Sequence, residues 1–255
     1  MNLSPPSSRP ADPKENDSKI ARSFAAPDWY VREFAANIRI RTETIMALME
    51  GVAPNRILDI GCGDGSLSIP LIQRARHVTY LDQSAAMLEL VESRVGKQNP
   101  AEICYINQSF MEAELPAAGY DLVICVGILA YVSDIGPFLA KIRSAMRPGG
   151  MLILECTDAY HFVSRAVCLY RRTTGLLKTK RFVTYPHRAA EVVAATEAQG
   201  LHLNNSFCYL YNLPILEKMV SSEMAYKWIR RIFGDIMNNH HAWLGKEHIL
   251  YFTSK

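Results

Sequence analysis

Three glycines at alternate positions are the residues best placed to do chemistry. Gly61, Gly63 and Gly65 directly follow a short apolar run over 56–60. Glycine lets a chain turn sharply and brings its backbone amides within reach of a ligand. Asp82 closes the next apolar run, where its carboxylate could accept both hydroxyls of a ribose. The spacing therefore predicts a nucleoside-containing ligand at this turn.

A dinucleotide-binding turn is the first alternative for these glycines. It would require Gly-x-Gly-x-x-Gly or Gly-x-Gly-x-x-Ala, but Ser66 stands at the third position. Carboxylates at Asp59 and Asp64 would repel a pyrophosphate, whereas they would favour the ammonium and sulfonium groups of S-adenosylmethionine. We therefore predict that the turn binds S-adenosylmethionine as a methyl donor.

The elements that must position this turn are short apolar runs that alternate with helical patterns. Helices are expected after the turn to about 75, over 84–95, over 135–146 and from 186 to 200. The expected strands cover 56–60, 77–81, 102–106, 121–126, 151–156, 201–211 and 247–253. Strands separated by helices predict an α/β fold with a doubly wound, mostly parallel sheet. Ligands bind such sheets at the carboxyl ends of the strands, where the strand order reverses.

The other segments surround this alternating core. Residues 1–27 carry five prolines and few apolar side chains, so a disordered tail is expected. Residues 28–50 show helical apolar spacing and predict a cap helix before a single domain that covers 28–255. A helical cap insertion is expected over 213–243, between the last two strands.

The insertion over 159–190 is basic, with seven Lys or Arg residues and no acidic residue. It also carries a helical apolar stripe, which predicts a lid helix whose arginines meet an anionic or phosphorylated acceptor. A solvated helix face is an equally ordinary explanation, and a basic amphipathic helix is also typical of proteins that lie on a membrane surface. The net charge of the whole chain is only +3 and does not indicate DNA binding.

Four stretches of the chain resemble the class I S-adenosylmethionine-dependent methyltransferases, in the order in which that family has them. They are Ile57-Leu58-Asp59-Ile60-Gly61-Cys62-Gly63-Asp64-Gly65, Leu81-Asp82, Tyr120-Asp121-Leu122-Val123-Ile124-Cys125 and Met146-Arg147-Pro148-Gly149-Gly150. The resemblance spans about 40–157 and implies a seven-stranded Rossmann-like sheet. It also implies that the glycine turn holds the methionine part, Asp82 the ribose and the stretch 108–110 the adenine. The expected cofactor-binding residues are Tyr30, Asp59, Gly61, Cys62, Gly63, Gly65, Asp82, Gln83, Met87, Ser109, Phe110, Val126 and Gly127.

Missing residues narrow the class of methyl acceptor. After the fourth strand the chain reads Cys125-Val126-Gly127-Ile128, which does not resemble the Asn-Pro-Pro-Tyr type of motif of base-amino methyltransferases. No cysteine has the Pro-Cys or Thr-Cys setting of cytosine-C5 enzymes, and 126–132 offers no carboxylate for a metal. We expect metal-independent, in-line transfer to an oxygen or nitrogen of a small molecule.

Candidate catalytic residues follow from position and titration. Tyr131 stands after the fourth strand, where many small-molecule members of the family have a histidine. His187 follows the basic stretch, and His240 and His241 precede the last strand, so all three are candidates for a base.

Two other functions remain open at this level. An RNA methyltransferase would use the basic stretch and bind RNA with strong salt dependence, and a non-catalytic regulator would bind the cofactor without turnover. Six cysteines without a Cys-x-x-Cys pair, no apolar leader and no apolar run near 20 residues predict a cytoplasmic protein. It would act as a monomer or homodimer.

Overall fold

The computed structural model describes residues 13–23, 34–96, 99–173, 183–211 and 220–254. Its centre is one seven-stranded sheet in the order β3-β2-β1-β4-β5-β7-β6. The strands are β1 (Arg56–Ile60), β2 (His77–Leu81), β3 (Glu102–Ile106), β4 (Tyr120–Cys125), β5 (Met146–Thr157), β6 (Leu201–Tyr209) and β7 (Glu247–Ser254). The pairs among β1 to β5 are parallel, and β7 runs antiparallel to both β5 and β6. The predicted doubly wound, mostly parallel fold is confirmed.

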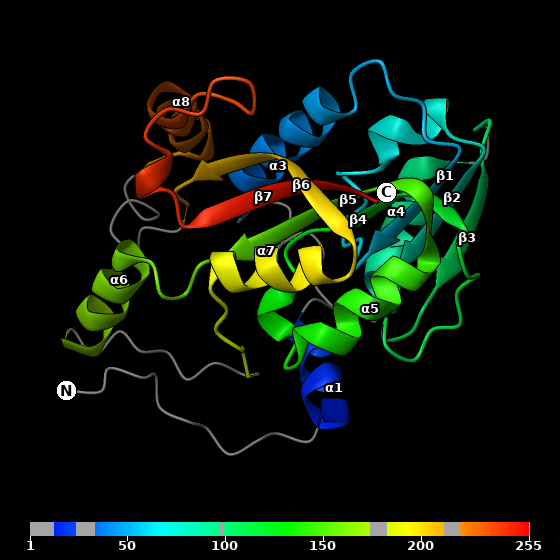
Figure 1. Ribbon diagram of the computed structural model, residues 1–255, viewed down its shortest axis with the longest axis horizontal. Coiled ribbons are helices and arrows are strands. Elements are labelled where there is room, and N and C mark those ends of the chain that lie inside the picture. The colour runs from blue at the N-terminus through cyan, green and yellow to red at the C-terminus, as the bar shows by residue number, and fades with distance from the viewer. Residues whose placement is uncertain (1–12, 24–33, 97–98, 174–182, 212–219, 255) are drawn as a thin grey trace.

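Both faces of the sheet are covered, as Figure 1 shows. One hydrophobic cluster joins the sheet to α3 (Ala35–Leu48), α4 (Ala85–Val95), the 3₁₀ helix η1 (Ile69–Arg74) and α8 (Ser222–Phe233). The other joins it to α5 (Ile135–Ala145) and α7 (Ala189–Ala198). Residues of β4 alternate between the two clusters because successive side chains of a strand point to opposite faces. A nearly all-apolar β4 follows from burial on both sides.

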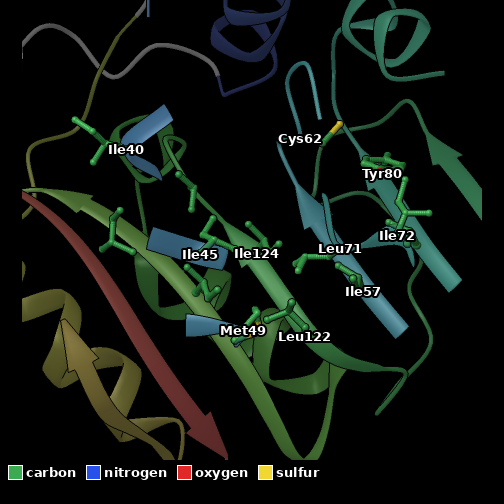
Figure 2. Packing of buried hydrophobic residues seen from close by; sticks show 14 of the residues in the cluster. Ile40, Ile45, Met49, Ile57, Cys62, Leu71, Ile72, Tyr80, Leu122 and Ile124 are labelled. Carbon is green, nitrogen blue, oxygen red and sulfur yellow. The ribbon is translucent and has the colours of Figure 1, made fainter. Parts of the chain in front are cut away.

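Helix α3 packs on the face of the sheet that carries the first of these hydrophobic clusters. Figure 2 shows Ile45 of this helix beside Ile124 of β4 and Met49, which follows the helix, beside Leu122; Ile40 belongs to the same cluster. All five side chains are fully buried. The packing holds the first turn of α3 close to the carboxyl ends of β1 and β4, where the strand order reverses.

Two expectations about these elements need correction, and a third is covered only in part by the described residues. The turn after the glycines leads to the six-residue η1 rather than to an α-helix, with Pro70 at its start. The fifth strand begins at Met146 instead of Met151, because 147–150 forms a bulge in the pairing of β5 with β4. The cap helix expected over 28–50 is described only as α3, and 28–33 lie outside the described residues.

The expectation of a disordered tail is wrong for helix α1 (Pro13–Ser23). Asn16 ties this polar helix to a distant segment, since its Oδ1 accepts the Val183 N–H at 2.8 Å and its Nδ2 donates to the Val183 carbonyl at 3.3 Å. Composition could not reveal a helix that is held by a tertiary contact. Residues 1–12 and 24–27 lie outside the described part of the chain.

Within the described ranges, none of the helices is both long enough and apolar enough to span a membrane.

Candidate functional site

A cavity of about 730 Å³ lies at the carboxyl ends of the parallel strands. Its walls come from the glycine turn after β1, from Asp82 after β2 and from the loop after β4 that contains the 3₁₀ helix η2 (Leu129–Tyr131). Residues of α1 and of the first turns of α3 also contribute to the lining. The position is the reversal of strand order between β1 and β4, where ligands of such sheets bind.

The glycine turn is built so that side chains would block it. Gly61 and Gly63 line the cavity with positive φ angles of 64° and 52°. A Cβ atom at Gly61 would lie 2.5 Å from Cγ2 of Ile128, which also lines the cavity. The Gly61 N–H donates to the carbonyl of Leu81 at 2.7 Å, which fixes the turn against the end of β2. This close approach explains why glycine is required.

Asp82 connects the turn to the next strand. One carboxylate oxygen accepts the Gly63 N–H at 2.9 Å, and the other accepts the Ser84 N–H at 2.8 Å. Burial raises the pKa of Asp82, although these amides oppose the rise. The carboxylate therefore holds the glycine turn in place and also faces the cavity, where it could accept ribose hydroxyls.

Asp59 and Asp64 do not line the cavity, which corrects the electrostatic reason given for a sulfonium ligand. The Asp59 carboxylate is buried and accepts the Ser68 hydroxyl at 2.5 Å. Asp64 pairs with Arg94 and accepts the Ser66 hydroxyl. Since side chains of a strand alternate, Asp59 points to the face of η1 while its neighbour Ile60 reaches the cavity.

Burial raises the pKa of Asp59 from 3.8 to about 7. The folded state therefore binds the proton more tightly than the unfolded state, so this group's contribution to stability is lost as the pH rises from about 4 to about 7. Asp59→Asn removes the titration and keeps an oxygen for Ser68. We expect thermal unfolding of this variant to depend less on pH across that window than wild type. Identical pH profiles for the two proteins would contradict this role of Asp59.

The remaining cofactor predictions divide into two groups. Cys62 and Gly65 belong to the turn but do not line the cavity. A Cβ atom at Gly65 would lie 2.8 Å from Ile69 Cδ1, so this glycine serves packing against η1. Tyr30 lies outside the described residues. The other predicted cofactor-binding residues line the cavity, namely Gln83, Met87, Ser109, Phe110, Val126 and Gly127.

Most of the predicted catalytic residues do not line the cavity. Tyr131 lines the cavity, and burial raises the pKa of its hydroxyl. His240 and His241 are exposed and stand outside the lining. His187 also lies outside the cavity lining. Its Nε2 is 3.0 Å from the Leu129 carbonyl and 2.9 Å from the Val132 carbonyl. Both partners are acceptors, so Nε2 carries a proton and anchors η2, which places Tyr131.

A polar cluster in the cavity wall was not predicted from the sequence. Glu155, at the end of β5, forms a buried ion pair with Arg41 of α3, whose Nε donates to Oε1 at 2.8 Å. The Tyr209 hydroxyl lies 2.7 Å from Asn37 Oδ1 and 3.1 Å from Glu155 Oε1. Burial raises the pKa of Glu155, and the charge of Arg41 opposes this rise. A charge at the end of an otherwise apolar strand was the signal that could have identified Glu155.

The described helices of the two insertions stand apart from the cavity lining. Helix α6 (Phe162–Thr173) and helix α8 contribute none of the lining residues among the described ranges, and α8 packs on α3 through Glu43, Tyr226 and Arg230. Instead, Ile20 of α1 lines the cavity. Tyr185, within the 159–190 insertion, and Tyr211, just before the 213–243 insertion, also contribute. Among the described residues, no three His, Cys, Asp or Glu side chains gather as a metal site requires.

Comparisons with known proteins agree with this geometry. The methyltransferase domain family matches residues 57–150. A ubiquinone biosynthesis O-methyltransferase of Aeromonas salmonicida is 33% identical over 169 residues, which cover 64% of this chain and 69% of that protein. An uncharacterized methyltransferase of Mycobacterium bovis is 32% identical over 116 residues, 46% of this chain and 57% of that protein. The chain thus spans little more than half the length of the latter relative.

Solved structures show the same fold at low identity. The magnesium protoporphyrin IX methyltransferase of Synechocystis PCC 6803 with bound S-adenosylhomocysteine has a TM-score of 0.65 and 16% identity, over 94% of this chain and 100% of that chain. A 1,6-didemethyltoxoflavin N1-methyltransferase of Burkholderia thailandensis has a TM-score of 0.63 and 14% identity, over 99% of this chain and 94% of that chain.

The cavity suits the cofactor that these comparisons imply. Gly61 and Gly63 line the cavity together with Asp82, and a Cβ atom at Gly61 would crowd this part of its wall. The glycines let a ligand approach the backbone closely, and a carboxylate beside them can accept the hydroxyls of a ribose. With the sheet order, the glycine turn and the Aeromonas relative in agreement, the chain belongs to the class I S-adenosylmethionine-dependent methyltransferases.

Proposed function

We propose that this protein transfers the methyl group of S-adenosylmethionine to an oxygen or nitrogen atom of a small molecule bound beside Arg41 and Glu155. One observation carries the proposal: the cavity continues beyond the glycine turn to a second, polar end lined by Asn37, Arg41, Glu155 and Glu247. A cofactor held at Gly61, Gly63 and Asp82 leaves this end for an acceptor.

The bound cofactor supplies a methyl group already activated on a sulfonium. The chain's own residues then have to hold the acceptor in line with that methyl group, which can supply much of the rate acceleration. Tyr131 is suited to positioning rather than to proton removal, because its raised pKa keeps the hydroxyl protonated near neutral pH. Ile20, Tyr185 and Tyr211 narrow the cavity above the acceptor and exclude water.

The pair of Arg41 and Glu155 is the proposed anchor for the polar group of the acceptor. The carboxylate fixes the guanidinium through two hydrogen bonds, and Arg41 reaches to within van der Waals distance of where a side chain at Gly127 would begin. Gly127 also lines the cofactor half of the cavity. The pair thus lies between the two halves, where an acceptor atom has to meet the methyl group.

The acceptor is proposed to be largely apolar, with a hydroxyl or amino group, rather than phosphorylated. Arg41 is the only basic residue among the described residues that line the cavity, and acidic side chains there include Glu112, Asp134 and Glu247. Arg165 of α6, which belongs to the stretch that was expected to meet an anion, is exposed and is not among the lining residues. The O-methyltransferase name of the Aeromonas relative favours an oxygen acceptor.

Transfer of labelled methyl groups from S-adenosylmethionine to a panel of phenols, amines and carboxylic acids tests the proposal. Cofactor binding without transfer to any acceptor class or to a metabolite extract would instead favour a non-catalytic regulator.

Arg41→Lys is expected to lower kcat/KM for the acceptor by ~10- to 100-fold, because a lysine loses the forked contact with Glu155 and the fixed orientation that this contact gives. The affinity for S-adenosylhomocysteine should change little. Arg230→Lys is the matched control, since Arg230 forms a similar pair with Glu43 outside the cavity. Equal losses in both variants, or a loss of cofactor affinity in Arg41→Lys, would contradict the acceptor role.

A further inference from the structure

Helix α6 has an apolar stripe that faces solvent. Phe162, Ala166 and Leu169 recur at helical spacing and are all exposed, with exposed fractions of 53% for Phe162 and 61% for Leu169. Trp243 of the 3₁₀ helix η3 (Ala242–Leu244) extends the stripe, since its ring stacks on Phe162 at a centroid distance of 6.0 Å and is 68% exposed. Large apolar side chains gathered in this way on a protein surface mark an interaction site.

Hydrogen bonds hold the beginning of α6 to the rest of the protein. The Asp158 carboxylate accepts the N–H groups of Tyr160 at 2.8 Å and His161 at 3.0 Å, just before α6 begins. It also accepts the Ala189 N–H, where the chain returns to the body. His161 Nε2 lies 2.9 Å from the Trp243 carbonyl, which joins α6 to η3. The apolar surface is therefore presented by a defined structure at one end of the molecule (Figure 1).

The basic charge of the segment that carries the stripe favours an anionic partner. Arg165 is exposed between Phe162 and Leu169, and the sequence over 159–190 holds seven basic residues and no acidic one. A second exposed stripe, Met224, Trp228 and Ile232 on α8, shares its helix with Glu223 as well as with basic residues. An amphipathic helix with aromatic and leucine side chains on one face and arginine beside them is typical of helices that lie in the surface of an anionic bilayer.

We propose that Phe162, Arg165, Ala166, Leu169 and Trp243, here called the α6 surface, dock the protein on a membrane that contains anionic phospholipid. The apolar side chains enter the boundary between headgroups and acyl chains, and Arg165 meets the phosphates. Each basic residue near such a surface strengthens binding by about fivefold.

Docking also places the cavity close to lipid. The chain leaves the sheet after Thr157 to form α6 and comes back at Tyr185, and both of these residues line the cavity. An acceptor dissolved in the bilayer would then have a short path to the polar end. This last step rests on the proposed function, whereas the docking itself does not.

Flotation of the full-length protein with lipid vesicles tests the docking without any need for activity. Wild type is expected to float with vesicles of phosphatidylcholine and phosphatidylglycerol, to bind pure phosphatidylcholine weakly, and to be released by high salt. Phe162→Glu combined with Leu169→Glu should lower the partition coefficient at least ~10-fold. The matched control, Ala140→Glu combined with Ala198→Glu, adds the same charge at exposed positions of α5 and α7 and should bind like wild type.

Thermal unfolding and S-adenosylhomocysteine binding are measured on each variant, and both should equal those of wild type if only docking is changed. Wild type that stays with neither vesicle type, or a control that loses as much binding as the α6 variant, would overturn the proposal. So would a wild-type dimer that ignores vesicles and becomes a monomer in the α6 variant, since the surface would then bind a second copy.

Discussion

Asp82→Asn is expected to weaken S-adenosylhomocysteine binding by up to ~100-fold, the equivalent of losing one or two hydrogen bonds to a charged acceptor. The Asp82 carboxylate accepts the amides of Gly63 and Ser84, and it faces the cavity where ribose hydroxyls are expected. The asparagine side chain has an NH₂ group in place of one carboxylate oxygen. This group would face a backbone N–H or the ribose, and the hydrogen bond accepted there would be lost. Isothermal titration calorimetry measures the loss.

Asp121→Asn is the matched control for that change. Asp121 also accepts a backbone amide, the Arg56 N–H at 2.7 Å, but it lies at the opposite end of the sheet from the cavity. Its replacement should leave cofactor affinity within about twofold of wild type, as is usual for a distant site. Equal losses in both variants would show that Asp82 acts only through overall stability.

Gly61→Ala is the second change with a large expected effect. Alanine at φ 64° carries a backbone cost of about 1–2 kcal/mol. The new methyl group would also collide with Cγ2 of Ile128, and a β-branched side chain cannot easily rotate away. Displacement of Ile128 would move η2 and Tyr131, so both the cofactor turn and the acceptor side should suffer. Overpacking of this kind adds about 1–3 kcal/mol of destabilisation.

The control is Gly51→Ala, because Gly51 has a similar φ of 71° and no atom lies within 4 Å of the position that its new methyl group would take. Chemical denaturation should show only the backbone cost for Gly51→Ala and a loss about twice as large for Gly61→Ala. Cofactor affinity should fall only in the latter. If the two variants lose the same stability and both bind cofactor normally, the close approach of Gly61 and Ile128 has no functional role.

Much of the fold could be predicted because each buried parallel strand leaves an apolar run in the sequence. The runs at β1, β2, β3 and β4 differ from the observed strands by at most one residue at each end. The glycine turn and Asp82 were identified for the same reason, since they follow those runs directly. Polar α1 was missed because its stability comes from contacts such as Asn16 with Val183, which local composition does not encode.

The acceptor end of the site was harder to predict for a geometric reason. Arg41 and Glu155 are 114 residues apart, and Tyr209 is separated from Asn37 by 172. No local spacing links such residues, so only the fold brings them together. The prediction for His187 had a different difficulty. An imidazole can act as a base, but Nε2 of His187 donates to the carbonyls of Leu129 and Val132 at the two ends of η2.

A crystal structure with S-adenosylhomocysteine tests the central claim most directly. We expect the ribose hydroxyls on Asp82, the amino-acid part against Gly61 and Gly63, the adenine beside Ser109 and Phe110, and the sulfur facing Arg41 and Glu155. Binding of the ligand at the Arg41 and Glu155 end, with the glycine turn left uncontacted, would contradict it.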